Sequence, residues 1–138
     1  MKKIDKLIEE FPALYRKAPP ETGHSKFPFQ LHGFYCQMPG WYDILHKLSV
    51  QLEPFFVDDQ SLYVHQIKEK FGGLRFYISH FPKEREKQIK MLAIIDTAMA
   101  ESLETCDICG QSGKLTNLNS YICVRCPEHK KSNWRDYE

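Results

Sequence analysis

The chain has 138 residues, 42% of them hydrophobic and 27% charged, and its formal net charge is +1. Such a length suits one ordinary domain that buries a core, with room for a small appendage. A net charge so close to zero excludes a global electrostatic attraction to nucleic acid or to an anionic membrane. An anionic partner would therefore have to meet a local basic patch.

The sequence predicts a soluble, cytoplasmic protein that does not contact a membrane. Its longest apolar run, residues 91–95, is far too short to span a bilayer. The first residues, MKKIDKLIEEF, carry acidic side chains where a secretory signal has an uninterrupted apolar segment.

Apolar residues at helical spacing predict two helices in the first half of the chain. One lies within residues 2–15 and ends near Pro12. The other covers residues 41–53 and ends at Pro54, because proline lacks the N–H that continues a helix. Asp43 lies in the first turn of the second helix, where a carboxylate suits the positive end of the helix dipole. We prefer this structural role for Asp43 to a catalytic one.

Residues 16–39 contain four prolines and two glycines, and the prolines at the start of this segment cannot sustain a helix. Its aromatic residues argue against disorder, because a solvated linker has little use for them. We expect an ordered loop that Phe27, Phe29 and Phe34 hold in place, with a short strand over residues 30–35.

Residues 63–80 predict a β-hairpin, because two runs of strand-type residues are joined by Gly72-Gly73. With these glycines as the loop, Lys70 lies opposite Arg75, and side chains alternate between two faces. His65 and His80 then pair near the open end of the apolar face. That face, which we expect on the core, carries Ile67, Phe71, Leu74, Phe76 and Ile78.

The other face of the predicted hairpin is polar and basic. Two cations opposite each other destabilise a strand pair by some tenths of a kcal/mol up to about 1 kcal/mol. Either a neighbouring carboxylate or solvent neutralises them, or the face is an anion site for phosphate or carboxylate groups. The sequence leaves both alternatives open. The candidate binding residues are Lys68, Lys70 and Arg75, with Tyr77 as a stacking surface.

The longest predicted helix begins at Pro82 or Lys83 and runs to about residue 105. At 1.5 Å per residue it would be roughly 35 Å long, enough to lie across the hairpin. Its expected buried stripe consists of Ile89, Leu92, Ile95, Met99 and Leu103, broadened by Met91, Ile94 and Ala98.

Two Cys-x-x-Cys pairs in the last quarter of the chain predict a metal site. Clustered cysteines in a chain without a signal peptide indicate thiolate ligands rather than disulfides. Cys106 and Cys109, followed by glycine, have the form of a zinc knuckle. The second half offers two ligand pairs of suitable spacing, Cys123 with Cys126 or Cys126 with His129. Either choice gives four protein ligands and no open position, which indicates structural zinc.

Four segments of the chain share a pattern with known proteins. They are PGWYDIL at 39–45, QIKEKFGGLRFY at 66–77, CDICG at 106–110 and CPEH at 126–129. Together they resemble a family of small, largely uncharacterised proteins of phages and prophages, over residues 34–129. The resemblance implies His129 as the fourth ligand, with Cys123 as the alternative. It also implies a phage-related accessory protein inside the bacterial cell, and it implies no activity.

The sequence as a whole predicts an α+β fold, in which an antiparallel hairpin or small sheet is packed by two or three helices. This part would cover residues 1–105, followed by a zinc knuckle or ribbon over 106–129 and a polar tail over 130–138.

For function, we expect a non-enzymatic binding protein with structural zinc and an anionic partner at the hairpin face. That partner would be nucleic acid or a nucleotide, with the countering of host defence as one role. One alternative is an inhibitor that binds a host protein through the aromatic loop 27–35. The other is an enzyme acting on nucleic acid, for which Asp43, His65 and His80 are the candidates and no catalytic motif is present.

Overall fold

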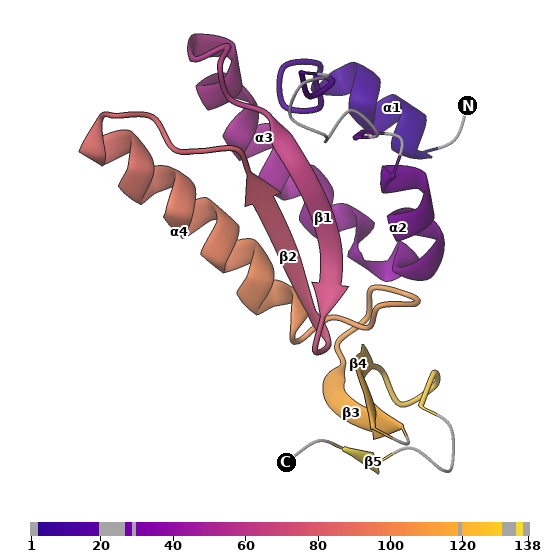
Figure 1. Cartoon of the computed structure of the whole chain (residues 1–138). Helices are drawn as coiled ribbons and strands as arrows, with labels where there is room; N and C mark the ends of the chain where they lie inside the picture. Colours follow the sequence, from indigo (N-terminus) through magenta and orange to yellow (C-terminus); the bar gives the residue numbers. More distant parts are fainter. Residues whose placement is uncertain (1–2, 20–26, 29, 119, 131–134, 137–138) are drawn as a thin grey trace.

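The computed structural model describes residues 3–19, 27–28, 30–118, 120–130 and 135–136 (Figure 1). These residues form helices and small antiparallel sheets, which confirms the predicted α+β class. No helix in these ranges is long and apolar enough to cross a membrane. In chain order the elements are α1 (Lys3–Glu10), α2 (Leu31–Gln37), a 3-10 turn (Pro39–Trp41), α3 (Tyr42–Asp58), β1 (Val64–Lys70), β2 (Gly73–Ile78), α4 (Arg85–Ser102), β3 (Lys114–Leu118), β4 (Tyr121–Arg125) and β5 (Arg135–Asp136).

The hydrophobic core joins the β1–β2 hairpin to α3 and α4, which pack against each other (Figure 1). The hairpin contributes Ile67, Leu74 and Phe76, all from the face that the alternation of side chains predicts. Burying an apolar side chain of this size stabilises the fold by roughly 1.5–3 kcal/mol. The apolar face therefore fixes the hairpin on the helices. The buried apolar residues of α3 are Ile44, Leu45, Leu48, Leu52 and Phe56.

The segment after α1 is fixed to α3 by hydrogen bonds. The helix ends just before Pro12, close to the predicted position. The carboxylate of Glu53 on α3 accepts hydrogen bonds from the backbone N–H groups of Ala13 and Leu14, at 3.2 and 2.6 Å. These two N–H groups lie outside any regular helix, and the Glu53 carboxylate supplies the acceptors that they need. It therefore stabilises the irregular chain that follows α1.

The predicted strand over residues 30–35 is wrong, because this segment belongs to helix α2. Leu31 and Phe34 are three residues apart and share the buried side of that helix. Phe27 and Phe34 are buried, as the sequence predicts, while Phe29 lies outside the described residues.

Helix α3 continues to Asp58, so the predicted end at Pro54 is also wrong. Proline inside a helix removes one hydrogen bond and costs about 3 kcal/mol. The extra turn buries Phe56, whose side chain is 0% exposed, and the Phe56 carbonyl accepts a hydrogen bond from Arg16. These contacts offset the cost of the proline.

The hairpin forms, but its turn is Phe71-Gly72, one residue earlier than predicted. Both turn residues have positive φ, +53° and +86°, as a type I′ turn requires. Arg75 therefore lies opposite Lys68 rather than Lys70. The side chains keep their predicted faces within the strands, because moving both ends of a tight turn by one residue shifts the pairing and not the alternation.

Phe71 is the residue most affected by this change of register. Its side chain is 70% exposed at the tip of the hairpin, and it is not part of the core as predicted. A left-handed conformation costs a residue with a side chain roughly 1–2 kcal/mol. Phe71 is thus unfavourable both in its backbone conformation and in its exposure.

The open end of the hairpin also differs from the prediction. The pairing is irregular at His65, so His65 and His80 do not face each other. The ring of His65 stacks on Tyr77 instead, with 6.0 Å between ring centroids and 13° between planes. Nε2 of His80 lies 3.1 Å from Oγ of Ser61, in the loop before β1.

Helix α4 is shorter than predicted at both ends, with 18 residues from Arg85 to Ser102, and the predicted buried stripe is wrong in part. Ile89, Leu92 and Leu103 are 56%, 45% and 43% exposed. The prediction is confirmed for Met91, Ile95 and Ala98, which are buried together with Ser102 where the helix packs against α3 and β2. Ile94 and Met99 are partly buried against the core.

Candidate metal centre and hairpin face

Tight turns bring the two halves of the candidate metal centre together. In the knuckle, the N–H of Gly110 donates to the Cys106 carbonyl at 3.0 Å, and Gly110 has φ +82°. A glycine adopts this left-handed conformation without steric cost. In the second half, the N–H of His129 donates to the Cys126 carbonyl at 3.1 Å.

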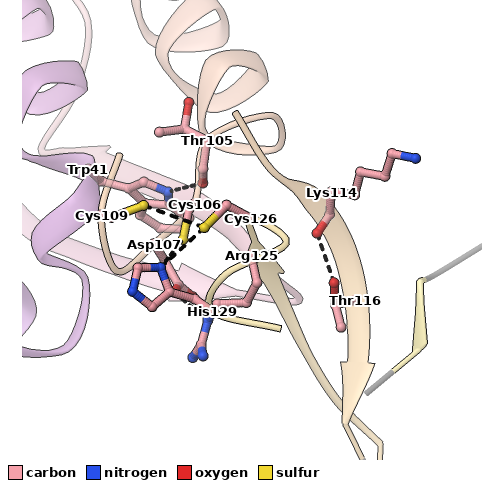
Figure 2. A network of polar contacts seen from close by, with 10 residues as sticks. All are labelled: Trp41, Thr105, Cys106, Asp107, Cys109, Lys114, Thr116, Arg125, Cys126 and His129. Atoms are coloured by element: carbon pink, nitrogen blue, oxygen red, sulfur yellow. Dashed lines mark hydrogen bonds and ion pairs between the residues drawn. The ribbon is translucent and has the colours of Figure 1, made fainter. Parts of the chain in front are cut away.

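The side chains of Cys106, Cys109, Cys126 and His129 point toward one another and could bind a metal ion (Figure 2). One ligand atom from each of them lies within 4.8 Å of all the others. Nδ1 of His129 is 3.2 Å from the Cys126 sulfur and 3.6 Å from the Cys106 sulfur. The sulfurs of Cys109 and Cys126 are 3.6 Å apart. The structure therefore groups the ligand set that includes His129.

The backbone around the knuckle favours a thiolate at Cys106. Burial alone would raise the pKa of this thiol. Hydrogen bonds from the backbone of Cys109, Cys126 and Ile108 outweigh burial and lower the pKa to about 7. At Cys109, the backbone of Gln111 acts to lower the pKa, but burial and the two neighbouring thiols outweigh it and raise the pKa. Three thiols so close together repel one another as anions, which a bound cation would relieve.

Cys123 lies outside this group of four. It is buried on β4, opposite Thr116. Burial raises the pKa of its thiol to about 11, although Arg125 acts in the other direction. Because the cluster of possible ligand atoms consists of Cys106, Cys109, Cys126 and His129, the geometry disfavours Cys123 as the fourth ligand.

An ion pair ties the knuckle to β4. Asp107 is 1% exposed, and its Oδ1 lies 2.6 Å from Nε of Arg125 without the alignment of a hydrogen bond. Burial raises the pKa of Asp107 to about 6, and the guanidinium of Arg125 opposes this rise. The N–H of Asp107 also donates to the Val124 carbonyl at 2.9 Å. Such contacts around a metal site hold its ligands in position.

The 3-10 turn before α3 holds the knuckle against the rest of the protein, a role that helical periodicity does not reveal. The N–H of Gly40 donates to the Asp107 carbonyl at 2.9 Å, and Nε1 of Trp41 donates to the Thr105 carbonyl at 2.9 Å (Figure 2). A Cβ atom at residue 40 would lie 2.1 Å from the Cys106 carbonyl oxygen. Only glycine allows the two backbones to approach so closely.

The predicted basic residues share the polar side of the hairpin, which we call the hairpin face and define as Lys68, Lys70, Arg75 and Tyr77. Lys70 is exposed, and the other three are half-buried. Arg75 lies directly opposite Lys68 across the strand pair. Within the described ranges, no carboxylate forms an ion pair with any of the three cations. Neutralisation by a neighbouring carboxylate, one half of the first alternative in the sequence analysis, therefore finds no support, and nothing here tests the other half, screening by solvent.

The tip of the hairpin packs on the β3–β4 ribbon, next to the metal centre (Figure 1). A Cβ atom at Gly72 would lie 2.9 Å from Cδ1 of Leu115 and 3.2 Å from Cγ2 of Ile122. Oε2 of Glu69 accepts a hydrogen bond from the Gly72 N–H at 2.7 Å. The hairpin is thus in direct contact with the ribbon beside the candidate metal centre.

Two of the candidates for an enzymatic site, Asp43 and His80, lie far apart. Asp43 lies in the first turn of α3. His80 contacts Ser61, which in turn donates to Asp59 just after the last turn of the same helix. Because α3 has 17 residues, its two ends are roughly 24 Å apart at 1.5 Å per residue.

The fold and the cluster define a small α+β protein with four side chains that could bind a metal ion. No family model, curated protein or solved structure matches the chain. The resemblance to phage and prophage proteins therefore stays a prediction from the sequence.

Proposed function

We propose that Cys106, Cys109, Cys126 and His129 bind one structural zinc ion. The donor set supports zinc, because three sulfurs and one imidazole nitrogen suit its borderline-soft character and tetrahedral geometry. Four protein ligands leave no coordination position for a substrate. The ion would contribute on the order of 10 kcal/mol to folding of the C-terminal segment.

We further propose that the protein is a non-enzymatic binding protein and that the hairpin face binds an anionic partner. The observation that carries this proposal is the pair of opposed cations, Lys68 and Arg75, with no carboxylate in an ion pair with either among the described residues. Such a pair destabilises the free protein. A phosphate group between the two side chains would turn the repulsion into two charge-assisted hydrogen bonds.

Phosphate-bearing partners, nucleic acid or a nucleotide, suit this face better than a protein partner at residues 27–35. The protein-directed alternative needs accessible aromatic side chains. Phe27 and Phe34 are 1% and 9% exposed, Tyr35 is half-buried, and Phe29 lies outside the described residues. In line with the phage resemblance, we propose that the partner belongs to the cytoplasm of an infected bacterial cell.

The zinc proposal is tested by the mass of the freshly purified protein under native and denaturing conditions. A difference of one zinc ion per chain is expected, and an additional anionic species would identify a small ligand of the hairpin face. If the protein is fully folded and its native mass includes no metal, the proposal is contradicted.

The anion proposal is tested with ATP, inorganic polyphosphate and a fluorescein-labelled oligonucleotide as probes. The double variant Lys68→Gln/Arg75→Gln should bind at least ten times more weakly. For the oligonucleotide, the slope of log K against log salt concentration should become shallower by about 0.7 per lost phosphate contact. Lys90→Gln removes an exposed cation from α4 and serves as the control. Equal binding by the double variant, or no binding of any probe by the wild type, overturns the proposal.

A further inference from the structure

The tip of the hairpin carries an aromatic side chain in an unfavourable place. Phe71 has φ +53° and is 70% exposed. Asparagine is the favoured residue at this position of a type I′ turn before glycine, because it tolerates positive φ and is polar. Strained positions of this kind occur preferentially at sites of function.

The fold of the tip does not depend on the Phe71 ring. The turn is held by Glu69, through its hydrogen bond to the Gly72 N–H, and by the packing of Gly72 on Leu115 and Ile122. Behind the turn, the N–H of Leu74 donates to Oγ of Ser102 at 2.9 Å. The ring therefore projects from a rigid, already positioned turn.

Charge and aromatic surface alternate along the hairpin. The stacked pair of His65 and Tyr77 lies toward the open end, and Phe71 lies at the tip. The opposed cations lie between them, and Nζ of Lys70 is 5.7 Å from the centre of the Phe71 ring. Four residues of strand from Tyr77 to the turn span about 13 Å, a length over which an extended strand can present several phosphates and bases.

We propose that the hairpin binds single-stranded nucleic acid, with the Phe71 ring stacked on a base and the cations on the backbone phosphates. This inference rests on the proposed function of the hairpin face and names its partner. Proteins that bind single strands combine a positive track with aromatic stacking platforms in this way. A base paired in a duplex has no free face for the ring, and an apolar pocket of a protein would have to desolvate Lys70 beside it.

The variant Phe71→Asn tests the inference, because it removes the ring and relieves the turn together. The probe is a fluorescein-labelled oligothymidylate of about 12 nucleotides, within the usual site sizes. Phe71→Asn should weaken binding roughly five- to 150-fold, and it should raise the melting temperature by roughly 3–5 °C. Ile89→Asn, which removes another exposed apolar side chain from α4, should leave binding unchanged.

The outcomes separate this inference from the proposal on which it rests. If Lys68→Gln/Arg75→Gln weakens binding and Phe71→Asn does not, the ring has no stacking role and the inference fails alone. If duplex of the same length, ATP or polyphosphate binds more tightly than the single strand, the inference again fails while the anion site stands. If the wild type binds none of these probes, both fail. Weaker binding by Phe71→Asn, at raised thermal stability, supports the inference.

Discussion

Replacing Gly40 by alanine should detach the metal centre from the rest of the protein. The added Cβ atom would lie 2.1 Å from the Cys106 carbonyl oxygen, 2.6 Å from the Gly110 nitrogen and 2.9 Å from the Asp107 carbonyl carbon. All three are backbone atoms, so no side chain can rotate away to make room. The two segments must separate by more than 1 Å, roughly, before ordinary contact distances are restored.

The size of the effect follows from two contributions. Overpacking costs about 1–3 kcal/mol and here reaches the upper end, because only backbone atoms can yield. Separation also lengthens the hydrogen bond from Gly40 to Asp107, worth about 1 kcal/mol. A loss of about 3–4 kcal/mol in the free energy of unfolding lowers the melting temperature of a chain of this size by about 10–15 °C.

The assay is thermal unfolding followed by circular dichroism, at a fixed zinc concentration. Gly33→Ala is the matched control, because nothing lies within 4 Å of its added Cβ and the residue is inside α2. This control should gain about 0.5–1 kcal/mol. A Gly40→Ala variant that melts within about 3 °C of the wild type would refute the proposed role of this glycine.

Three further predictions concern the ligand set, the hydrogen bond behind the hairpin turn and alkaline stability. Native mass spectrometry should find no bound zinc in Cys109→Ser, whereas Cys123→Ser should bind the proposed zinc ion like the wild type; loss of zinc from Cys123→Ser would make Cys123 a ligand. Ser102→Ala leaves the buried N–H of Leu74 without an acceptor and should cost about 1–3 kcal/mol in urea unfolding, and a neutral result would refute this. Burial raises the pKa of Tyr15 above its ordinary 10.0, so the stability it contributes is complete below pH 10 and falls as the pH rises toward the raised value. Tyr15→Phe should flatten that alkaline decline, and an unchanged profile would exclude this tyrosine as its cause.

The cluster of possible metal ligands could be predicted in large part because its chemistry is local. Two thiols three residues apart can meet one ion whatever the rest of the chain does. The choice between Cys123 and His129 was not local, because it depends on which way β4 faces its neighbours. In the structure Cys123 belongs to a strand packed in the interior, and His129 lies in the turn that follows.

The hairpin was predictable in kind but not in register. Two glycines in a row allow two adjacent tight turns, and local propensity favours the one that uses both. The observed turn places Gly72 against the ribbon and Gly73 beside Leu103, at positions where a Cβ atom would be crowded. Tertiary packing therefore determines the register, and it leaves Phe71 in a turn position that local sequence preferences do not favour for phenylalanine.

The missed helix α2 has a similar cause. Prolines and glycines near residues 31–37 obscure the short helical pattern in the sequence. A helix this short is stable only because it packs against the core. In α4 the apolar residues form two neighbouring rows, and periodicity cannot tell which of them contacts α3.

The packing of Gly72 on Leu115 and Ile122 couples the stability of the hairpin tip to that of the ribbon beside the candidate metal centre. If zinc holds the ribbon in its folded form, loss of the ion withdraws the support under the turn while every residue of the hairpin face remains in place. Affinity for the partner would then rise and fall with the concentration of free zinc, although the ion touches nothing that binds. The coupling is reciprocal, so a bound partner would in turn raise the affinity for zinc by the same factor.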